Sequence, residues 1–227
     1  TTPANLTALV GGRVIDPANG IDAIADVVCG DGKVLAVGSG VAATYLDADR
    51  IDCTNLIVTP GLIDLHVHVY PGLGNFCVTP DQAGVERGVP IVVDGGTSGT
   101  ATMQLALDWL DAAQPKTKVL SFMDPCVLYL ATHDFSCHKL EIANDTRNLD
   151  LDAAADLLEL HADRIVGFKV RACHTGDPEV SPFLEGAKSI AGDRPLVVHR
   201  GRLPHTASIT TDALLGSPRE GDIVTHA

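Results

Sequence analysis

The chain has 227 residues, and its 29 acidic against 16 basic residues give a formal net charge of −13 at pH 7. This length allows one large core, or a medium domain beside a small one. The acidity, without a cluster of Lys and Arg, argues against nucleic acid or an anionic membrane as a partner. No apolar run approaches the roughly 20 residues of a membrane-spanning helix, and no segment typical of a signal peptide opens the sequence.

The cysteines favour a reducing compartment. There are 6 of them, none in a Cys-x-x-Cys pair, and most lie within apolar runs. In a chain of this size, such cysteines are typical of buried thiols rather than of a disulfide framework. Because 45% of the residues are hydrophobic, we expect a globular, cytoplasmic protein.

Residues 1–58 are predicted to form a small all-β unit. Short apolar runs are separated by Gly and Asp turns, and Gly30-Asp31-Gly32 is a hairpin signal. The runs cover residues 9–15, 26–29, 33–37, 51–53 and 56–58. This unit has too little apolar material to stand alone, and Pro60-Gly61 marks its end. We therefore predict a domain over residues 1–58 and a second domain over residues 59–227.

The second domain alternates apolar strands with helical segments. Strands are predicted at residues 62–70, 90–94, 118–123, 164–170, 195–200 and 222–226. Helices are predicted from Thr79 and over residues 100–113, 151–160, 182–191 and 210–215. Such alternation indicates a parallel sheet covered on both faces. The sheet is either open and doubly wound, or part of a β/α barrel. A barrel has eight strand–helix units, and about six are visible.

Two histidines interrupt the strand predicted at residues 62–70. His66 and His68 are two positions apart, so in a strand both rings point to the same side. Paired imidazoles form a bidentate platform for Zn²⁺ and related ions. Two core histidines satisfied by hydrogen bonds are the alternative, and the pair alone does not decide between them.

Three further polar residues lie at or near the carboxyl ends of apolar strands. Lys169 ends one such run, where a lone ammonium is costly unless it is paired or modified. A desolvated lysine can react with CO₂ to give a carbamate, although for Lys169 alone a lysine that pairs with a carboxylate or snorkels at the strand end is the favoured interpretation. His199 and His226 end two more strands, and this rim is where active sites of parallel β/α folds form. Together with His66 and His68, these residues predict a metal site.

The sequence resembles the amidohydrolase superfamily. The resemblance is carried by the run TPGLIDLHVH at residues 59–68, by Lys169 and His199, and by Thr225-His226. Within that superfamily the chain is most similar to the dihydroorotase-like deacetylase branch. Three segments suggest this branch, residues 94–97 (DGGT), 167–171 (GFKVR) and 221–227 (GDIVTHA).

The resemblance implies a TIM-type (β/α)8 barrel entered from a small β-sandwich, and a binuclear metal centre. Zn²⁺ is the usual metal, and other divalent ions are possible. By position, His66 and His68 bind one ion, and His199 and His226 bind the other. Lys169, carboxylated, bridges the two ions, and a hydroxide between them is the nucleophile.

The superfamily also uses an Asp at the end of an eighth strand as a general base, and no residue here matches it. We therefore expect the parent polypeptide to continue past Ala227, and a 227-residue species on its own to be inactive. Two roles are open for the Arg171 side chain. It either contacts a carboxylate of the substrate or forms a salt bridge on the rim.

The predicted activity is hydrolysis of an amide or ester bond in a small acylated carboxylic acid. A cyclic amidase that resembles dihydroorotase or hydantoinase is the alternative enzyme. An inactive homologue with a structural role is the alternative outside catalysis. We expect a small-molecule substrate, no nucleic-acid or membrane partner, and a homo-oligomer.

Overall fold

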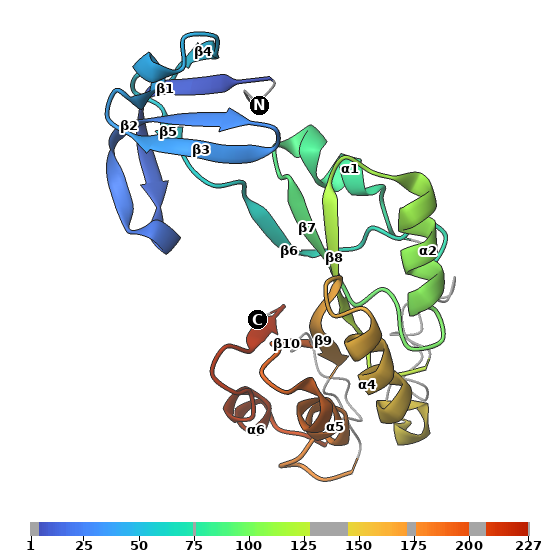
Figure 1. Ribbon diagram of the computed structural model, residues 1–227. Coiled ribbons are helices and arrows are strands. Elements are labelled where there is room, and N and C mark those ends of the chain that lie inside the picture. The colour runs from blue at the N-terminus through green and yellow to red at the C-terminus, as the bar shows by residue number, and fades with distance from the viewer. Residues whose placement is uncertain (1–4, 75, 128–144, 172–175, 200–207, 227) are drawn as a thin grey trace. The chain divides into compact units, whose positions relative to one another are not determined.

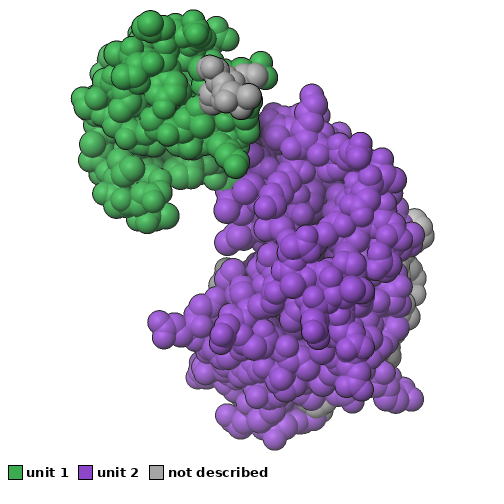
Figure 2. All heavy atoms as spheres, viewed as in Figure 1, with its two compact units in different colours: residues 1–62 green, residues 63–227 purple. Residues whose placement is uncertain are grey.

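A computed structural model describes residues 5–74, 76–127, 145–171, 176–199 and 208–226. The chain divides into two compact units, Thr1–Leu62 and Ile63–Ala227 (Figure 2). Within the described residues, no helix has the length and apolar character needed to cross a membrane. Cys29, Cys53, Cys77 and Cys126 are free thiols, whereas Cys137 and Cys173 lie outside the described residues.

The first unit is a mixed sheet of five strands (Figure 1). The strands are β1 (Thr7–Asp16), β2 (Ile21–Gly30), β3 (Lys33–Gly38), β4 (Asp49–Asp52) and β5 (Ile57–Val58). β1 pairs antiparallel with β2 and parallel with both β4 and β5. The predicted hairpin joins β2 to β3, and Asp31 and Gly32 adopt the left-handed backbone that such a turn requires (φ 50° and 72°). Completion of this sheet into a β-sandwich stays a prediction, as does the domain boundary at residue 58.

The second unit is built on a sheet of six parallel strands. These are β6 (Ile63–Val67), β7 (Ile91–Gly95), β8 (Lys118–Met123), β9 (Ile165–Arg171), β10 (Leu196–His199) and β11 (Ile223–Thr225). Their order in the sheet is their order in the chain. An open doubly wound sheet reverses its strand order at a switch point. The sequential order found here is instead the order of strands in a β/α barrel.

Helices follow most of these strands. They are α1 (Pro80–Ala83), α2 (Met103–Ala113), α4 (Leu151–Leu160), α5 (Pro182–Ala191) and α6 (Thr211–Gly216). Side-chain oxygens of Asp150, Ser181 and Thr210 accept the hydrogen bonds that start α4, α5 and α6. α5 packs against α4, β9 and β10. The helix predicted from Thr79 is only one turn long, because the chain passes at Gly84 into a 3₁₀ turn over Val85–Arg87.

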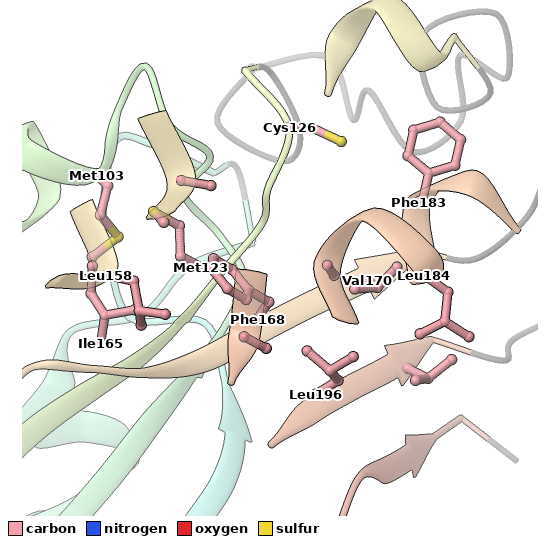
Figure 3. Packing of buried hydrophobic residues seen from close by; sticks show 14 of the residues in the cluster. Met103, Met123, Cys126, Leu158, Ile165, Phe168, Val170, Phe183, Leu184 and Leu196 are labelled. Carbon is pink, nitrogen blue, oxygen red and sulfur yellow. The ribbon is translucent and has the colours of Figure 1, made fainter. Parts of the chain in front are cut away.

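The main hydrophobic core lies between the sheet and its helices. The side chains drawn in Figure 3 show how strand residues such as Phe168 and Leu196 meet helix residues such as Leu158 and Leu184. Each of these four side chains is at most 7% exposed. Burial of a large apolar side chain contributes about 1.5–3 kcal/mol, so this layer fixes the strands whose ends carry the polar residues.

The strand predicted at residues 62–70 is shorter than expected. β6 ends at Val67, and its ladder to β7 is irregular between Asp64 and Val67. The backbone N–H of Val69 donates to the Asp94 carboxylate (3.0 Å) instead of continuing the ladder. His68 therefore lies just after the strand rather than inside it.

The six-stranded sheet is curled. β6 and β11 are its two edge strands, yet His66 Nδ1 of β6 and Thr225 Oγ1 of β11 are 2.9 Å apart. A flat sheet would hold its edges far apart, since neighbouring strands are separated by about 4.8 Å. The curl brings the carboxyl ends of all six strands around one point.

Replacing Gly167 by alanine should destabilise the second unit. Gly167 is buried in β9, and a Cβ there would overlap the backbone oxygen of Pro195 and press on Phe122. We expect Gly167→Ala to lower the free energy of unfolding by about 1–3 kcal/mol, the usual cost of overpacking. Chemical denaturation measures this change. Gly216→Ala is the matched control, because nothing lies within 4 Å of its Cβ position. Equal stability of the two variants would contradict the packing described for β9 and β10.

Candidate metal centre

The histidines and the lysine singled out in the sequence lie at one end of the parallel sheet. His66 belongs to β6, and His68 follows it by one residue. Lys169 is in β9, His199 ends β10, and His226 comes directly after β11. Because these strands are parallel, their carboxyl ends meet at the same rim, and the curl of the sheet closes the distance between its edges.

The structure brings these five side chains together. The ring centroid of His66 lies 5.5 Å from that of His68 and 4.9 Å from that of His226. His199 and His226 have centroids 4.6 Å apart. Lys169 Nζ is 3.2 Å from His66 Nε2. Within the described ranges, however, no three or more His, Cys, Asp and Glu side chains have the geometry of a metal-binding group. The imidazoles are neighbours rather than a formed cage.

Two glycines at the end of β7 make room for this arrangement. A Cβ on Gly95 would overlap the ring of His66, and a Cβ on Gly96 would overlap the stem of Lys169. Gly96 also has a positive φ of 86°, which L side chains rarely adopt. The backbone oxygen of Gly95 accepts a hydrogen bond from Lys169 Nζ (3.3 Å). The backbone of β7 therefore forms the surface on which His66 and Lys169 rest.

The Nδ1 atoms of two imidazoles are held by threonine hydroxyls. His66 Nδ1 is 2.9 Å from Thr225 Oγ1, and His68 Nδ1 is 2.8 Å from Thr97 Oγ1. Phe76 packs edge-on against the ring of His68, with centroids 4.6 Å apart. With Nδ1 engaged, Nε2 is the other ring nitrogen, which in His68 remains for a cation and in His66 faces Lys169 Nζ (3.2 Å). Histidines that bind metals commonly have their second ring nitrogen held in this way.

Burial keeps these side chains in the form a cation needs. It lowers the pKa of His66 to about 4, and of His68 and His199 to about 3. Their rings are thus neutral at neutral pH and carry a free lone pair. Lys169 is only 2% exposed, and burial lowers its pKa to about 8 against the opposing pull of Asp124 and Asp94. Neutral imidazoles are donors that suit Zn²⁺, and the lowered pKa leaves part of the Lys169 amine neutral.

The chain is similar to known deacetylases and dihydroorotases. No family model matches it. It is 32% identical to a deacetylase of Agrobacterium fabrum over 203 residues, which are 88% of this chain and 47% of that protein. It is 59% identical to a dihydroorotase of Citrifermentans bemidjiense over 64 residues, 28% of this chain and 15% of that one. A solved dihydroorotase superposes on 97% of this chain and 56% of its own, with a TM-score of 0.75 and 26% identity.

The chain belongs to the amidohydrolase superfamily. The structural relatives are TIM-barrel proteins of that superfamily, and the curled sheet of six parallel strands agrees with part of such a barrel. The chain spans about half the length of the curated deacetylases that it matches (47% and 50%). The ligand roles inferred for this amidohydrolase chain stay predictions.

Arg171, the predicted substrate contact, is the last residue of β9 and pairs in register with His199 of β10. With Asp124, Cys126 and Phe183 it lines a small cavity beside the rim. Burial raises the pKa of Asp124 and lowers the pKa of His199, and the positive charge of Arg171 opposes the first shift and adds to the second. The residue thus lies near the imidazoles of this amidohydrolase chain, and its two readings, substrate contact or rim ion pair, stay open.

Sequence reasoning missed several residues that shape this rim. In the sequence, Asp94 and Thr97 mark only a branch of the superfamily, Thr225 is only part of its motif, and no pattern singles out Asp124. Both aspartates are at most 2% exposed. The signal that could have found them is a carboxylate at the end of an apolar strand, since such a group needs hydrogen-bond donors or a nearby cation.

Asp124 should give this amidohydrolase chain a pH-dependent stability. Burial raises its pKa to about 7, well above the ordinary range of an aspartate, so between these values the folded state holds a proton that the unfolded state has lost. The unfolding free energy should therefore fall as pH rises from about 4 to about 7, then level off. Asp124→Asn removes this contribution while keeping an acceptor for the N–H of Cys126.

The measurement is urea denaturation of both proteins at several pH values. We expect the stability of Asp124→Asn relative to the parent to increase with pH across this window by at least about 1 kcal/mol, the equivalent of one pKa unit. A difference that stays constant from pH 4 to pH 8 would show that Asp124 titrates normally.

Proposed function

We propose that the protein is a metal-dependent hydrolase that cleaves an amide or ester bond of a small acylated carboxylic acid. The observation that carries this proposal is the convergence of four imidazoles on a buried lysine, with Lys169 Nζ 3.2 Å from His66 Nε2. Burying a lysine costs desolvation free energy that apolar packing does not return. The deacetylase relative, which matches 88% of the chain, supports the choice of an acylated substrate.

His66 and His68 would bind one divalent ion, and His199 and His226 the other, with Lys169 shared between them. Zn²⁺ suits imidazole and anionic oxygen ligands, and other divalent ions remain alternatives. Two such ions supply a polarised substrate carbonyl and a water of lowered pKa.

The chemistry of Lys169 follows from its surroundings. Its neutral amine nitrogen adds to the carbon of CO₂, a new N–C bond forms, and one N–H proton leaves to solvent. The product is a carbamate anion, which has the charge that a site of neutral imidazoles lacks. Because the pKa of Lys169 lies at about 8, the amine is partly neutral at physiological pH and this addition is accessible.

Arg171 would bind the carboxylate of the substrate. Its guanidinium can pair with a carboxylate through two parallel hydrogen bonds, and β9 presents it two residues beyond Lys169. A small acid bound there has its acyl group on the side of the imidazoles. This geometry favours an N-acyl or O-acyl acid over a neutral amide.

A cyclic amidase is the second candidate. The solved dihydroorotase with a TM-score of 0.75 and the local identity of 59% to another dihydroorotase favour it. A ring ureide that carries a carboxylate would use the same Arg171 contact, so the two candidates differ in the scissile bond rather than in the recognition of the acid.

The metal content of the purified protein should depend on Lys169. We expect about two divalent ions per chain and a Lys169 side chain that incorporates isotope-labelled bicarbonate as a carbamate. Lys169→Gln cannot be carboxylated and should lose at least one ion. Lys188→Gln in α5, where Lys188 pairs with Glu185, is the control and should keep the metal content of the parent. Elemental analysis gives the ion counts. A parent protein without metal would refute this function and favour an inactive homologue.

Arg171→Ala should weaken the binding of substrates that carry a carboxylate and leave the binding of neutral substrates nearly unchanged. We expect KM for an N-acyl amino acid to rise roughly 10–100-fold, the loss of one charged hydrogen-bonding contact, with a small change for the matching carboxamide. Steady-state assays of the polypeptide that contains this chain, with acylated acids and cyclic ureides side by side, measure this ratio and separate the two candidates. Equal effects on acid and carboxamide would exclude a carboxylate contact at Arg171.

A further inference from the structure

The buried carboxylate of Asp94 forms a second layer behind the candidate metal centre. Asp94 ends the apolar part of β7 and is 0% exposed. Its Oδ1 accepts hydrogen bonds from the backbone N–H groups of Gly96 (3.1 Å) and Thr97 (2.7 Å). Its Oδ2 accepts from the N–H of Val69 (3.0 Å) and from Thr97 Oγ1 (2.7 Å). Four donors therefore converge on this carboxylate.

This network fixes the direction of the hydrogen bond between Thr97 and His68. A carboxylate that receives four donors only accepts, and a hydroxyl has a single proton. The proton of Thr97 is therefore directed at Asp94 Oδ2, and Thr97 Oγ1 can offer only a lone pair to His68 Nδ1, 2.8 Å away. The proton in that contact has to come from the imidazole.

We infer that Asp94, acting through the hydroxyl of Thr97, holds the proton of His68 on Nδ1 and so reserves Nε2 as the atom that binds a cation. Asp94 and Thr97 are positioning residues in this scheme, because neither contacts the cation. The inference rests on the proposed function only in that Nε2 of His68 binds a metal ion. The position of the proton on Nδ1 does not depend on that function.

The tautomer of His68 determines whether its ring can bind a metal ion. A neutral imidazole exchanges its proton between two nitrogens, and only the tautomer with a free lone pair at the coordinating nitrogen can bind a metal. His68 lies outside the ladder of β6, so strand pairing does not fix its ring. The edge-on contact with Phe76 restrains the ring plane, and the Asp94–Thr97 pair restrains the proton.

The first test reads the tautomer directly, in metal-free protein, from the imidazole nitrogen resonances of His68. The parent protein and Thr97→Ser, which keeps the hydroxyl, should both show the Nδ1–H form. Thr97→Val removes the acceptor and should give a mixture or the Nε2–H form. Thr225→Val is the matched control, because Thr225 contacts His66 and not His68. It should leave the tautomer of His68 unchanged.

The second test measures Zn²⁺ affinity by competition with a chelator. Loss of a hydrogen bond behind a metal ligand typically weakens binding roughly 10–100-fold. We expect a decrease of this size for Thr97→Val and parental affinity for Thr97→Ser. Circular dichroism and thermal unfolding confirm that each variant is folded. If Thr97→Val does not fold, the tautomer of His68 in the parent protein still tests the inference.

The outcomes separate this inference from the proposed function. An Nε2–H form of His68 in the parent protein, or a Thr97→Val tautomer identical to that of the parent, would overturn the positioning role whether or not the protein binds Zn²⁺. A parent that shows the Nδ1–H form but binds no metal would support the Asp94–Thr97–His68 arrangement and refute the metal-dependent function.

Discussion

A lysine amine buried at the end of β9 is the constraint on which the rest of the rim depends. Removal of an isolated ammonium from water costs several kcal/mol even after relaxation. Lys169 is 2% exposed and touches the backbone oxygen of Gly95 and the ring of His66. The carboxyl groups of Asp124 and Asp94 raise the pKa of Lys169 and so oppose the effect of burial. The side chain is therefore tolerated only where carboxylates, carbonyl oxygens and lone pairs surround it, and the neighbouring strand ends provide them.

The backbone of β7 contributes as much to the site as any side chain. Gly95 and Gly96 occupy the positions where a Cβ would strike His66 and Lys169, and Asp94 organises the turn that follows by accepting from the N–H groups of Gly96 and Thr97. One short segment thus provides space, a turn and a hydrogen-bonding layer. The same segment draws Val69 out of the β6 ladder, which sets the position of His68.

Curling of the sheet unites the two halves of the donor set. His66 and His68 come from one edge strand and the residue after it, whereas His226 follows the opposite edge strand. Contacts between His66 and both Thr225 and His226 cross the rim. The apolar layer beneath α4 and α5 holds the central strands, so the positions of the polar side chains follow from packing that lies elsewhere in the unit.

The sequence by itself determined the alternation of strands and helices, because apolar runs and capping residues are local signals. It also determined which polar residues end those runs, and so it pointed to His66, His68, Lys169, His199 and His226. Only the tertiary structure decided between a barrel-type and a doubly wound sheet, because strand order is a long-range property. It also revealed the roles of Gly95, Asp94 and Thr97, since a close approach between strands and a hydrogen bond spanning 29 residues, from His68 to Thr97, leave no periodic trace in the chain.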